Sequence, residues 1–105
     1  MALKHLKTQE FDTVVTAAPL ALLDFWAEWC GPCRMVSPII EDLARQYDGR
    51  ALIAKVNVDE EADLARRFHV MSIPTVILFQ NGKEMKRLVG VQPIGTYTDL
   101  LDANL

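Results

Sequence analysis

Two cysteines stand where an apolar run meets an amphipathic segment, and this junction constrains the fold more than any other part of the chain. The run at residues 20–26 is short and largely aliphatic, which is typical of a buried β-strand. Beyond the cysteines, apolar side chains recur at helical spacing, and they are Val36, Ile39, Ile40, Leu43, Ala44 and Tyr47. The pattern predicts a strand that turns into a helix, with Cys30 and Cys33 at the turn.

This position predicts reactive thiols. A helix N-terminus offers unpaired backbone N–H groups and the positive end of the helix dipole, and both favour thiolate over thiol. We expect Cys30, at the mouth of the turn, to be an exposed nucleophile and Cys33, one turn later, to be more buried. Gly31 permits close backbone approach and Pro32 stiffens the turn. The arrangement suits thiol–disulfide exchange, in which Cys30 attacks a disulfide and Cys33 resolves the mixed disulfide.

Two other interpretations of the cysteine pair are weaker. A structural disulfide would close a loop of only four residues, and chain entropy gives such a short loop about 2 kcal/mol before strain. A metal site would need more ligands, but the two histidines, His5 and His69, are far apart and there is no second cysteine pair. We therefore favour a redox pair and expect no metal.

Length and charge point to a small enzyme. A chain of 105 residues that is half apolar is expected to form one domain, residues 1–105, with its own core. The net charge of −3, with both signs spread along the chain, indicates neither a nucleic-acid nor a membrane surface. Residues 1–7 lack the apolar core of an export signal, and no apolar run approaches a membrane span. We expect a cytoplasmic protein.

The whole chain is predicted to alternate strands and helices in an α/β fold with helices on both faces of a mixed sheet. The expected elements are an edge strand at 3–7, a helix at 8–18, a strand at 20–26, a helix at 32–49, a strand at 51–58, a short helix after residue 59, strands at 75–80 and 85–89, and a helix from about 93. Thr8 and Asp59 are the expected helix caps, and Asn81-Gly82 predicts a hairpin. The last helix is expected to bury Ile94, Tyr97, Leu101 and Leu105.

Asp24 and Lys55 are isolated charges in two apolar strands that should lie side by side. Because burial disfavours the ionised form, we expect the pKa of Asp24 to lie above its usual value. Asp24 ends the strand that leads to the cysteines, where it is placed to accept and return the proton of Cys33. The alternative is an ordinary Asp on the polar side of a half-exposed strand. A partly buried pair with Lys55 is expected, because two unpaired charges would cost more.

Three smaller features complete the interpretation. Trp29 is expected to be partly exposed, since Trp26 already supplies an aromatic side chain to the strand. Pro74 opens a strand, and sequence alone favours a trans bond before it. Surface or filling roles are expected for Met35, His69 and Met71.

The segment Leu23–Arg34, LDFWAEWCGPCR, resembles the active-site segment of the thioredoxin family. The similarity continues in family order and spacing through residues 54–59, 72–75, 81–82, 89–90 and 101–105. It covers essentially the whole chain without insertions. The resemblance implies the thioredoxin fold, a mixed five-stranded sheet flanked by four helices, with the first three strands parallel and both hairpin strands antiparallel to them.

The resemblance also implies a site. Asp24 matches the family's buried acid and Lys55 its charge partner. The Ile73–Pro74 bond would be cis and packed against the cysteines, and the backbone of Ile73 would pair with an extended client segment. The implied apolar docking surface comprises Trp29, Gly31, Pro32, Val58, Ile73, Pro74, Val89 and Gly90.

As a function, the resemblance implies a general protein-disulfide reductase with no bound cofactor. Its Cys30–Cys33 disulfide would be recycled by an NADPH-dependent thioredoxin reductase, and Pro32, where isomerases and oxidants of this fold usually carry His, points to a reductant. Implied clients are ribonucleotide reductase, peroxiredoxins and methionine sulfoxide reductase, served by a monomer. The alternative is a binding subunit that holds a partner through the same apolar surface without redox turnover.

Overall fold

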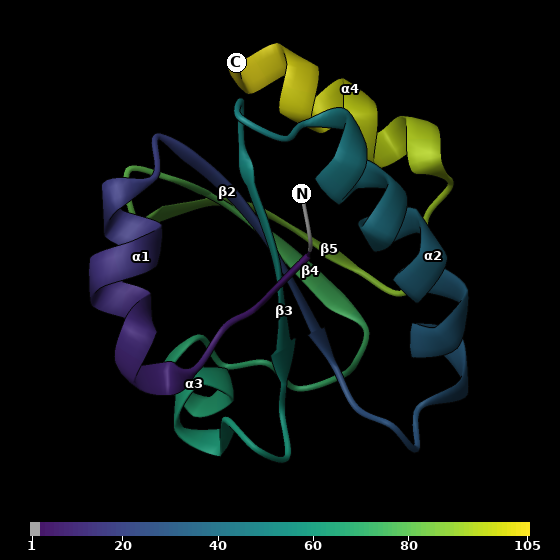
Figure 1. Ribbon diagram of the computed structural model, residues 1–105. Helices are drawn as coiled ribbons and strands as arrows, with labels where there is room; N and C mark the ends of the chain where they lie inside the picture. The colour runs from purple at the N-terminus through teal and green to yellow at the C-terminus, as the bar shows by residue number, and fades with distance from the viewer. Residues whose placement is uncertain (1–2) are drawn as a thin grey trace.

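A five-stranded sheet forms the centre of the protein in the computed structural model, which describes residues 3–105 (Figure 1). Residues 1 and 2 lie outside the described residues. They belong to the N-terminal segment in which the sequence predicts no export signal. The strands are β1 (Lys4–His5), β2 (Leu20–Trp26), β3 (Leu52–Asn57), β4 (Thr75–Gln80) and β5 (Lys83–Val89). They are arranged in the order β1-β3-β2-β4-β5, so β2 is the central strand.

Strand direction agrees with the prediction except at β5. The strands β1, β2 and β3 are mutually parallel, and β4 pairs antiparallel with β2. Because β5 pairs antiparallel with β4, it runs in the same direction as β2. The expectation that both hairpin strands oppose the first three is therefore wrong for β5. A hairpin reverses the chain once more, which returns its second strand to the original direction.

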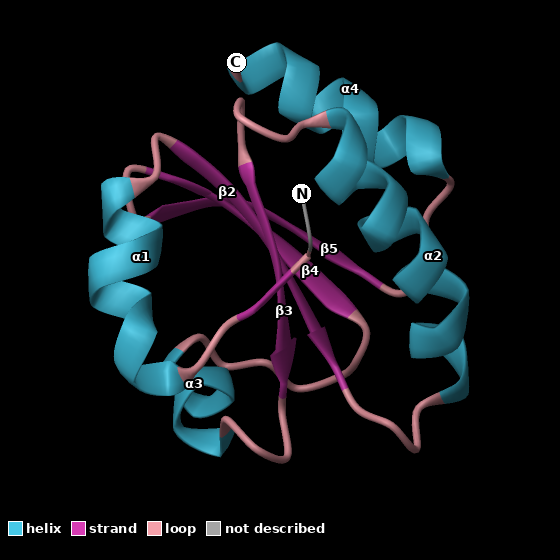
Figure 2. Ribbon diagram, in the orientation of Figure 1, coloured by secondary structure: helices cyan, strands magenta, loops and turns pink. Residues whose placement is uncertain are grey.

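Helices cover both faces of the sheet, as predicted (Figure 2). The helices α1 (Phe11–Ala17) and α3 (Ala62–Arg67) pack on one face, and α2 (Gly31–Gln46) and α4 (Ile94–Asn104) pack on the other. A single 3₁₀ turn, η1 (Thr8–Glu10), precedes α1. Within the described residues, no helix is both long enough and apolar enough to cross a membrane.

The two apolar layers explain why β2 is apolar at every position except Asp24. Ala21, Leu23 and Phe25 point into the layer under α1 and α3, whereas Leu20 and Leu22 point into the layer under α2 and α4. A strand that is buried on both faces needs no alternation of polar and apolar residues. Asp24 has the same parity as Leu20 and Leu22, which directs its carboxylate to the face covered by α2 and α4.

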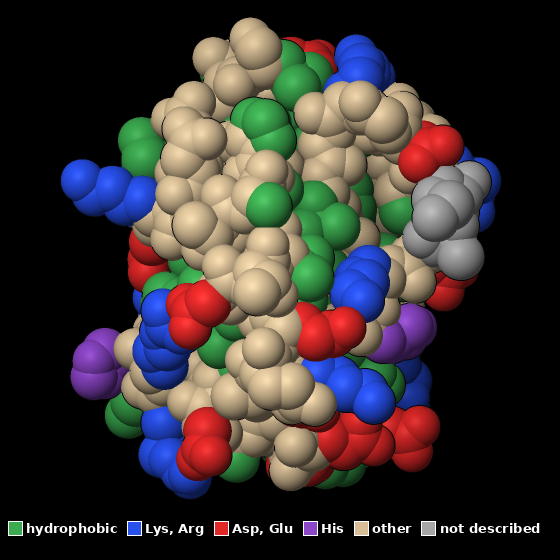
Figure 3. Space-filling view, turned by 60° about the vertical axis from the view of Figure 1, so that its left-hand side comes forward, with side chains coloured by type: hydrophobic (Ala, Val, Ile, Leu, Met, Phe, Trp, Pro, Cys, Tyr) green, Lys and Arg blue, Asp and Glu red, His purple; other side chains and the backbone are tan. Residues whose placement is uncertain are grey.

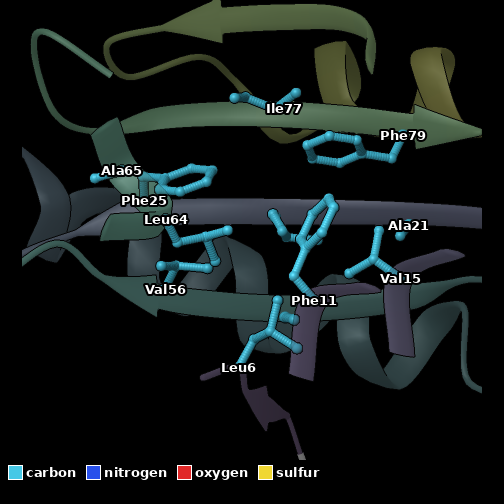
Figure 4. Close-up of a cluster of buried hydrophobic side chains, with 12 residues drawn as sticks. Leu6, Phe11, Val15, Ala21, Phe25, Val56, Leu64, Ala65, Ile77 and Phe79 are labelled. Carbon is cyan, nitrogen blue, oxygen red and sulfur yellow. The ribbon is translucent and has the colours of Figure 1, made fainter. Parts of the chain in front are cut away.

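Aromatic packing closes the layer under α1. Figure 4 shows Phe11 reaching from α1 toward the strands, with Phe79 of β4 beside it. The ring centroids of Phe11, Phe68 and Phe79 are 5.0 to 5.3 Å apart, with the rings tilted or edge-on. This is the geometry that aromatic rings prefer, and it ties α1, the end of α3 and β4 together.

Both expected helix caps are wrong. Thr8 belongs to η1, where its N–H and its hydroxyl both donate to a carboxylate oxygen of Glu61, at 2.8 and 2.9 Å. The helix α3 begins only at residue 62, because the side chain of Asn57 first accepts hydrogen bonds from the N–H groups of Asp59 and Glu60. The sequence correctly places a polar residue near each helix start. The hydrogen-bond partner of Thr8 is distant in sequence, however, and Asp59 belongs to a turn that precedes the helix.

The last helix buries less than expected. Tyr97 and Leu101 are fully buried, whereas Ile94 is 36% exposed and Leu105 is 55% exposed. Ile94 is the first residue of α4 and Leu105 follows its last turn. Both residues have the helical spacing of the buried stripe, but they stand at the two ends of α4, where the stripe extends past the core.

Charged side chains on one face of the molecule are not separated by sign. On the face drawn in Figure 3, basic and acidic side chains are interspersed. This distribution agrees with the spread of both signs along the sequence.

The hairpin between β4 and β5 generates a test of the fold. Asn81 and Gly82 have φ values of 53° and 83°, and a Cβ atom on Gly82 would lie 3.0 Å from Oγ1 and 3.1 Å from Cα of Thr16. Gly82→Ala is expected to lower the free energy of unfolding by about 1–2 kcal/mol in urea denaturation, through left-handed strain and this contact.

Gly95→Ala is the matched control, because a Cβ there meets nothing within 4 Å and the residue lies in α4. It is expected to raise the free energy of unfolding by about 0.5–1 kcal/mol. A Gly82→Ala variant as stable as the parent would contradict the assigned turn.

Candidate active site

The two cysteines form a disulfide at the start of α2, with their Cα atoms 5.3 Å apart. Cys30 is the N-cap residue of α2, and its extended backbone precedes the first helical turn. The backbone N–H of Cys33 donates to the Sγ atom of Cys30 over 3.2 Å. Because this is one of the unpaired N–H groups of a helix start, it would stabilise negative charge on Cys30 after reduction.

Cys30 is more enclosed than expected, whereas Cys33 is buried as expected. Cys30 is 4% exposed and Cys33 is 2% exposed, so the expectation of an exposed Cys30 is wrong, although Cys33 is the more buried of the two. The enclosure comes from apolar neighbours on other segments, which are Trp26, Ala27, Val58 and Ile73. Gly31 and Pro32, which lie between the cysteines, are exposed, so the disulfide lies directly beneath the surface.

The loop that contains Ile73, which follows Cys30 by 43 residues in the sequence, packs against the disulfide. The Ile73–Pro74 bond is cis, as the family resemblance implies and in contrast to the expectation from sequence alone. The carbonyl oxygen of Ile73 lies 3.8 Å from the Sγ atom of Cys30, within reach of a thiol on the reduced protein. The carbonyl of Pro74 accepts a hydrogen bond of 2.8 Å from the N–H of Gly90, which ties this loop to the end of β5.

The surface around the disulfide is apolar. Trp29 is 69% exposed, which confirms the expectation for this side chain, and Val89 is 53% exposed. The indole N–H of Trp29 donates to a carboxylate oxygen of Asp59 over 2.8 Å, so Asp59 orients this ring instead of capping a helix. Gly31 and Pro32 are exposed, Val58, Ile73 and Gly90 are half-buried, and Pro74 is buried.

Met71 extends this surface and was missed as a site residue. It is 92% exposed and lines a groove of about 310 Å³ together with Trp29, Val58, Val70, Ser72 and Ile73. The only sequence signal was its position two residues before Ile73. Met35 is also exposed, and so is His69, as expected for surface residues.

Asp24 lies deep beneath the site. It is fully buried, opposite Lys55 of β3 and Val76 of β4 in the sheet register. Neither of its carboxylate oxygens has a hydrogen-bond partner within residues 3–105. Burial raises the pKa of Asp24 from 3.8 to about 7, and the positive charge of Lys55 opposes this shift only in part.

Lys55 is the register neighbour of Asp24, but the two side chains do not form the expected contact pair. The ammonium of Lys55 donates to the hydroxyl of Ser37 over 2.8 Å and lies 4.2 Å from the centroid of the Trp26 ring. Among the ion pairs of the described residues, none joins Lys55 to Asp24. The long side chain of Lys55 extends to α2, where the hydroxyl of Ser37 accepts its hydrogen bond, and the ring of Trp26 at the end of β2 lies beside the ammonium.

Ser37 is a second residue that sequence reasoning missed. It follows Cys33 by four residues on α2, so both side chains lie on one helix face, and this spacing could have identified it. A cleft of about 210 Å³ reaches this face from solvent, and its lining residues are Trp26, Ala27, Glu28, Cys33, Arg34, Ser37 and Lys55. The cleft therefore connects Cys33 and Lys55 with bulk water.

Metal ligands do not gather at the site. Within the described part of the chain, no group of three or more His, Cys, Asp or Glu residues is arranged to hold a metal ion. The functional groups at the site are a disulfide, a buried carboxyl group and a buried ammonium.

Known proteins with a similar sequence and structure were found, and they agree with this arrangement of the site. The sequence model of the Thioredoxin family matches residues 2–103. Thioredoxins from Staphylococcus epidermidis and Staphylococcus haemolyticus are 43% and 44% identical to the chain over 105 residues, covering all of both proteins. The structure of a mutant thioredoxin from Halobacterium salinarum superposes with a TM-score of 0.88 at 37% identity, covering 97% of this chain and 88% of that one.

Thioredoxins carry electrons on their active-site disulfide and need no prosthetic group, and they work between a thioredoxin reductase and disulfide-containing client proteins. The alternative hypothesis, a binding subunit without redox turnover, has no support in these comparisons. The chain belongs to the thioredoxin family and is a thiol–disulfide oxidoreductase that reduces protein disulfides.

Proposed function

We propose that Cys30 is the attacking thiol, Cys33 the resolving thiol, Asp24 the group that moves the proton of Cys33, and Lys55 the charge that acts on Asp24. The observation that carries this assignment is the N–H of Cys33 aimed at the sulfur of Cys30 at the start of α2. It supports charge on Cys30 in preference to Cys33. The roles together account for one complete transfer of two electrons to a client disulfide.

The proposed cycle begins with the dithiol. The thiolate of Cys30 attacks one sulfur of a client disulfide, a mixed disulfide forms, and the other client sulfur leaves and takes up a proton. Asp24 accepts the proton of Cys33, whose thiolate then attacks the sulfur of Cys30. The second client sulfur leaves as a thiolate and takes up the proton that Asp24 releases, and the Cys30–Cys33 disulfide remains. The client gains two electrons and two protons, and the cysteine pair has lost them.

Burial supports the proton role of Asp24. An acid–base group works best when its pKa is close to the working pH, and burial raises the pKa of Asp24 to about 7. The carboxyl group has no hydrogen-bond partner within residues 3–105 that would hold it in one protonation state. The cleft beside Cys33 and Lys55 offers a route by which water exchanges the proton with solvent.

We propose that clients dock on the eight-residue surface of Trp29, Gly31, Pro32, Val58, Ile73, Pro74, Val89 and Gly90. Residues 72–74 precede β4 and lie outside the sheet ladder, so the backbone of Ile73 is suited to pair with an extended client segment. The exposed rings and aliphatic side chains around it would contact apolar client residues.

The cellular setting completes the proposal. The chain would work as a single domain and a monomer in the cytoplasm, recycled by an NADPH-dependent thioredoxin reductase. Its specific clients would be ribonucleotide reductase, peroxiredoxins and methionine sulfoxide reductase. Family membership supports a reductase and disulfide-containing clients in general.

Trapping separates the two cysteine roles. Cys33→Ser is expected to accumulate a stable mixed disulfide between Cys30 and a client protein, because the resolving thiol is missing. Non-reducing electrophoresis and mass spectrometry would identify the bond. The control Cys30→Ser should trap no client, and a parent in which neutral-pH alkylation modifies Cys33 before Cys30 would reverse the assignment.

The burial of Asp24 makes stability depend on pH in a known direction. Its pKa is 3.8 in ordinary surroundings and about 7 in the fold, so the unfolded chain loses this proton first as pH rises. The penalty is absent below the lower value, grows between the two and is constant above the upper one. Asp24→Asn is therefore expected to stabilise the oxidised protein at pH 7 by up to about 4 kcal/mol.

This gain should vanish toward pH 3 when unfolding is measured in urea across the pH range. The exposed Asp99→Asn is the control and should change stability by less than about 0.5 kcal/mol. A less stable Asp24→Asn variant at pH 7 would show that Asp24 is not a penalised buried charge.

Activity should move in the opposite direction. An amide cannot take the proton from Cys33, so Asp24→Asn is expected to slow resolution and lower the rate of insulin disulfide reduction by about tenfold or more near neutral pH. The rate is followed as NADPH consumption with thioredoxin reductase in excess, so that recycling does not limit it. An Asp24→Asn variant that reduces insulin as fast as the parent removes Asp24 from the mechanism.

A further inference from the structure

Ser37 occupies a distinctive position under the redox site. It lies on α2 one turn after Cys33, is half-buried, and lines the cleft that opens beside that cysteine. Its hydroxyl accepts a hydrogen bond of 2.8 Å from the ammonium of Lys55. No step of the proposed cycle uses this hydroxyl, so its role lies in what it does to Lys55.

The ammonium of Lys55 is held from two sides. Ser37 binds it from α2, and the ring of Trp26 at the end of β2 lies 4.2 Å away. The Lys55 residue is only 7% exposed. A buried ammonium needs such partners, because loss of its water shell is otherwise uncompensated.

The carboxylate of Asp24 lies beside Lys55 in the sheet but forms no hydrogen bond with its ammonium. Asp24 is directly across from Lys55 in the register of β2 and β3, and the parity of both strands directs the two side chains to the face covered by α2. Yet the oxygens of Asp24 have no hydrogen-bond partner within residues 3–105. The ammonium of Lys55 could neutralise Asp24, but it is bound to Ser37 and lies beside the ring of Trp26.

We propose that Ser37 is a positioning residue of the redox site: its hydroxyl holds the Lys55 ammonium against Trp26, close enough to act on Asp24 but out of contact with its oxygens. The inference rests on the proposed role of Asp24 as the group that moves the proton of Cys33.

The proposed placement has a functional consequence. A contact ion pair would keep Asp24 ionised at neutral pH and reduce its ability to hold a proton, whereas a distant cation would leave burial unopposed and keep it protonated. With Lys55 held nearby, burial still raises the pKa of Asp24 and the positive charge limits the rise. Ser37 would thereby keep Asp24 able both to accept and to release a proton near neutrality.

Few other titratable groups face Asp24. Lys55 faces it from β3, and Tyr97 of α4 is close enough that the charge of Asp24 contributes to raising the pKa of its hydroxyl, after burial. Cys33 of α2 titrates only in the reduced protein. Experiments on the oxidised protein therefore isolate Asp24 from the thiols.

Other charged groups surround Lys55 but are separate from the proposed contact. Glu28 and Arg34 line the same cleft, and the guanidinium of Arg34 donates to the backbone carbonyl of Glu28 over 2.9 Å. Lys55 also lines a smaller cleft, together with His5, Lys7, Glu60 and Glu61 among others. These groups stay unchanged in every variant proposed below.

The test is the titration of the Asp24 carboxyl group, followed by ¹³C NMR of the oxidised protein labelled at aspartate. In Ser37→Ala the released ammonium is expected to contact the unpaired carboxylate, and the titration midpoint should fall by about one pH unit or more. Ser37→Thr retains a hydroxyl on the same carbon and should keep the midpoint of the parent.

Three results would overturn the proposal. They are an unchanged or raised midpoint in Ser37→Ala, a Ser37→Thr variant that shifts as far as the alanine variant, and a Ser37→Ala shift that persists in a Lys55→Met background, where the action cannot pass through Lys55. The titration reports positioning alone, whereas the insulin-reduction rate of Asp24→Asn reports the proton role. Failure of one is therefore distinguishable from failure of the other.

Discussion

The central strand is buried on both faces, and the site depends on this constraint. Because helices cover β2 from either side, any charge on it must be buried, and Asp24 is. Residues 27–30 join the carboxyl end of β2 to the first turn of α2, so the cysteines stand at a helix start soon after Asp24 in the sequence. The reactive disulfide and the buried acid are therefore consequences of one strand and the helix that follows it.

Three different electrostatic sources act within this small region. The N–H of Cys33 favours charge on Cys30, burial disfavours charge on Asp24, and the ammonium of Lys55 moderates the second effect. None of them is a strong contact ion pair. Groups whose charged and neutral forms are close in free energy exchange protons readily, and this suits a pair of thiols that must lose and regain protons in each cycle.

In the proposed mechanism, stability and function oppose each other at Asp24. The carboxyl group of Asp24 is fully buried without a hydrogen-bond partner, which costs free energy of folding. An apolar side chain would not have this cost, and the neighbouring Leu22 and Leu23 are buried to the same extent. A stable core surrounds it, formed by the aromatic cluster under α1 and the aliphatic layer under α2 and α4. The remaining core compensates for the cost of this one carboxyl group, to which we assign the proton transfer.

Local pattern determined much of this protein by itself. Three local signals specify their elements: the apolar run of β2, which only Asp24 interrupts, the helical spacing of α2 and the Asn81-Gly82 turn. Such signals arise from neighbouring residues and the period of the backbone. An isolated Asp in an apolar strand likewise predicts its own burial and raised pKa. The cysteine spacing at a helix start predicts the redox chemistry.

Tertiary structure alone decided which distant groups meet. Lys55 extends to Ser37 instead of Asp24, Asp59 orients Trp29 instead of capping a helix, and Ile73 helps to enclose Cys30. Each outcome depends on a contact between packed elements, made by residues that are at least 18 positions apart in sequence. Periodicity describes the face on which a side chain lies, but the partner it finds there depends on the shape and chemistry of the segment packed against it.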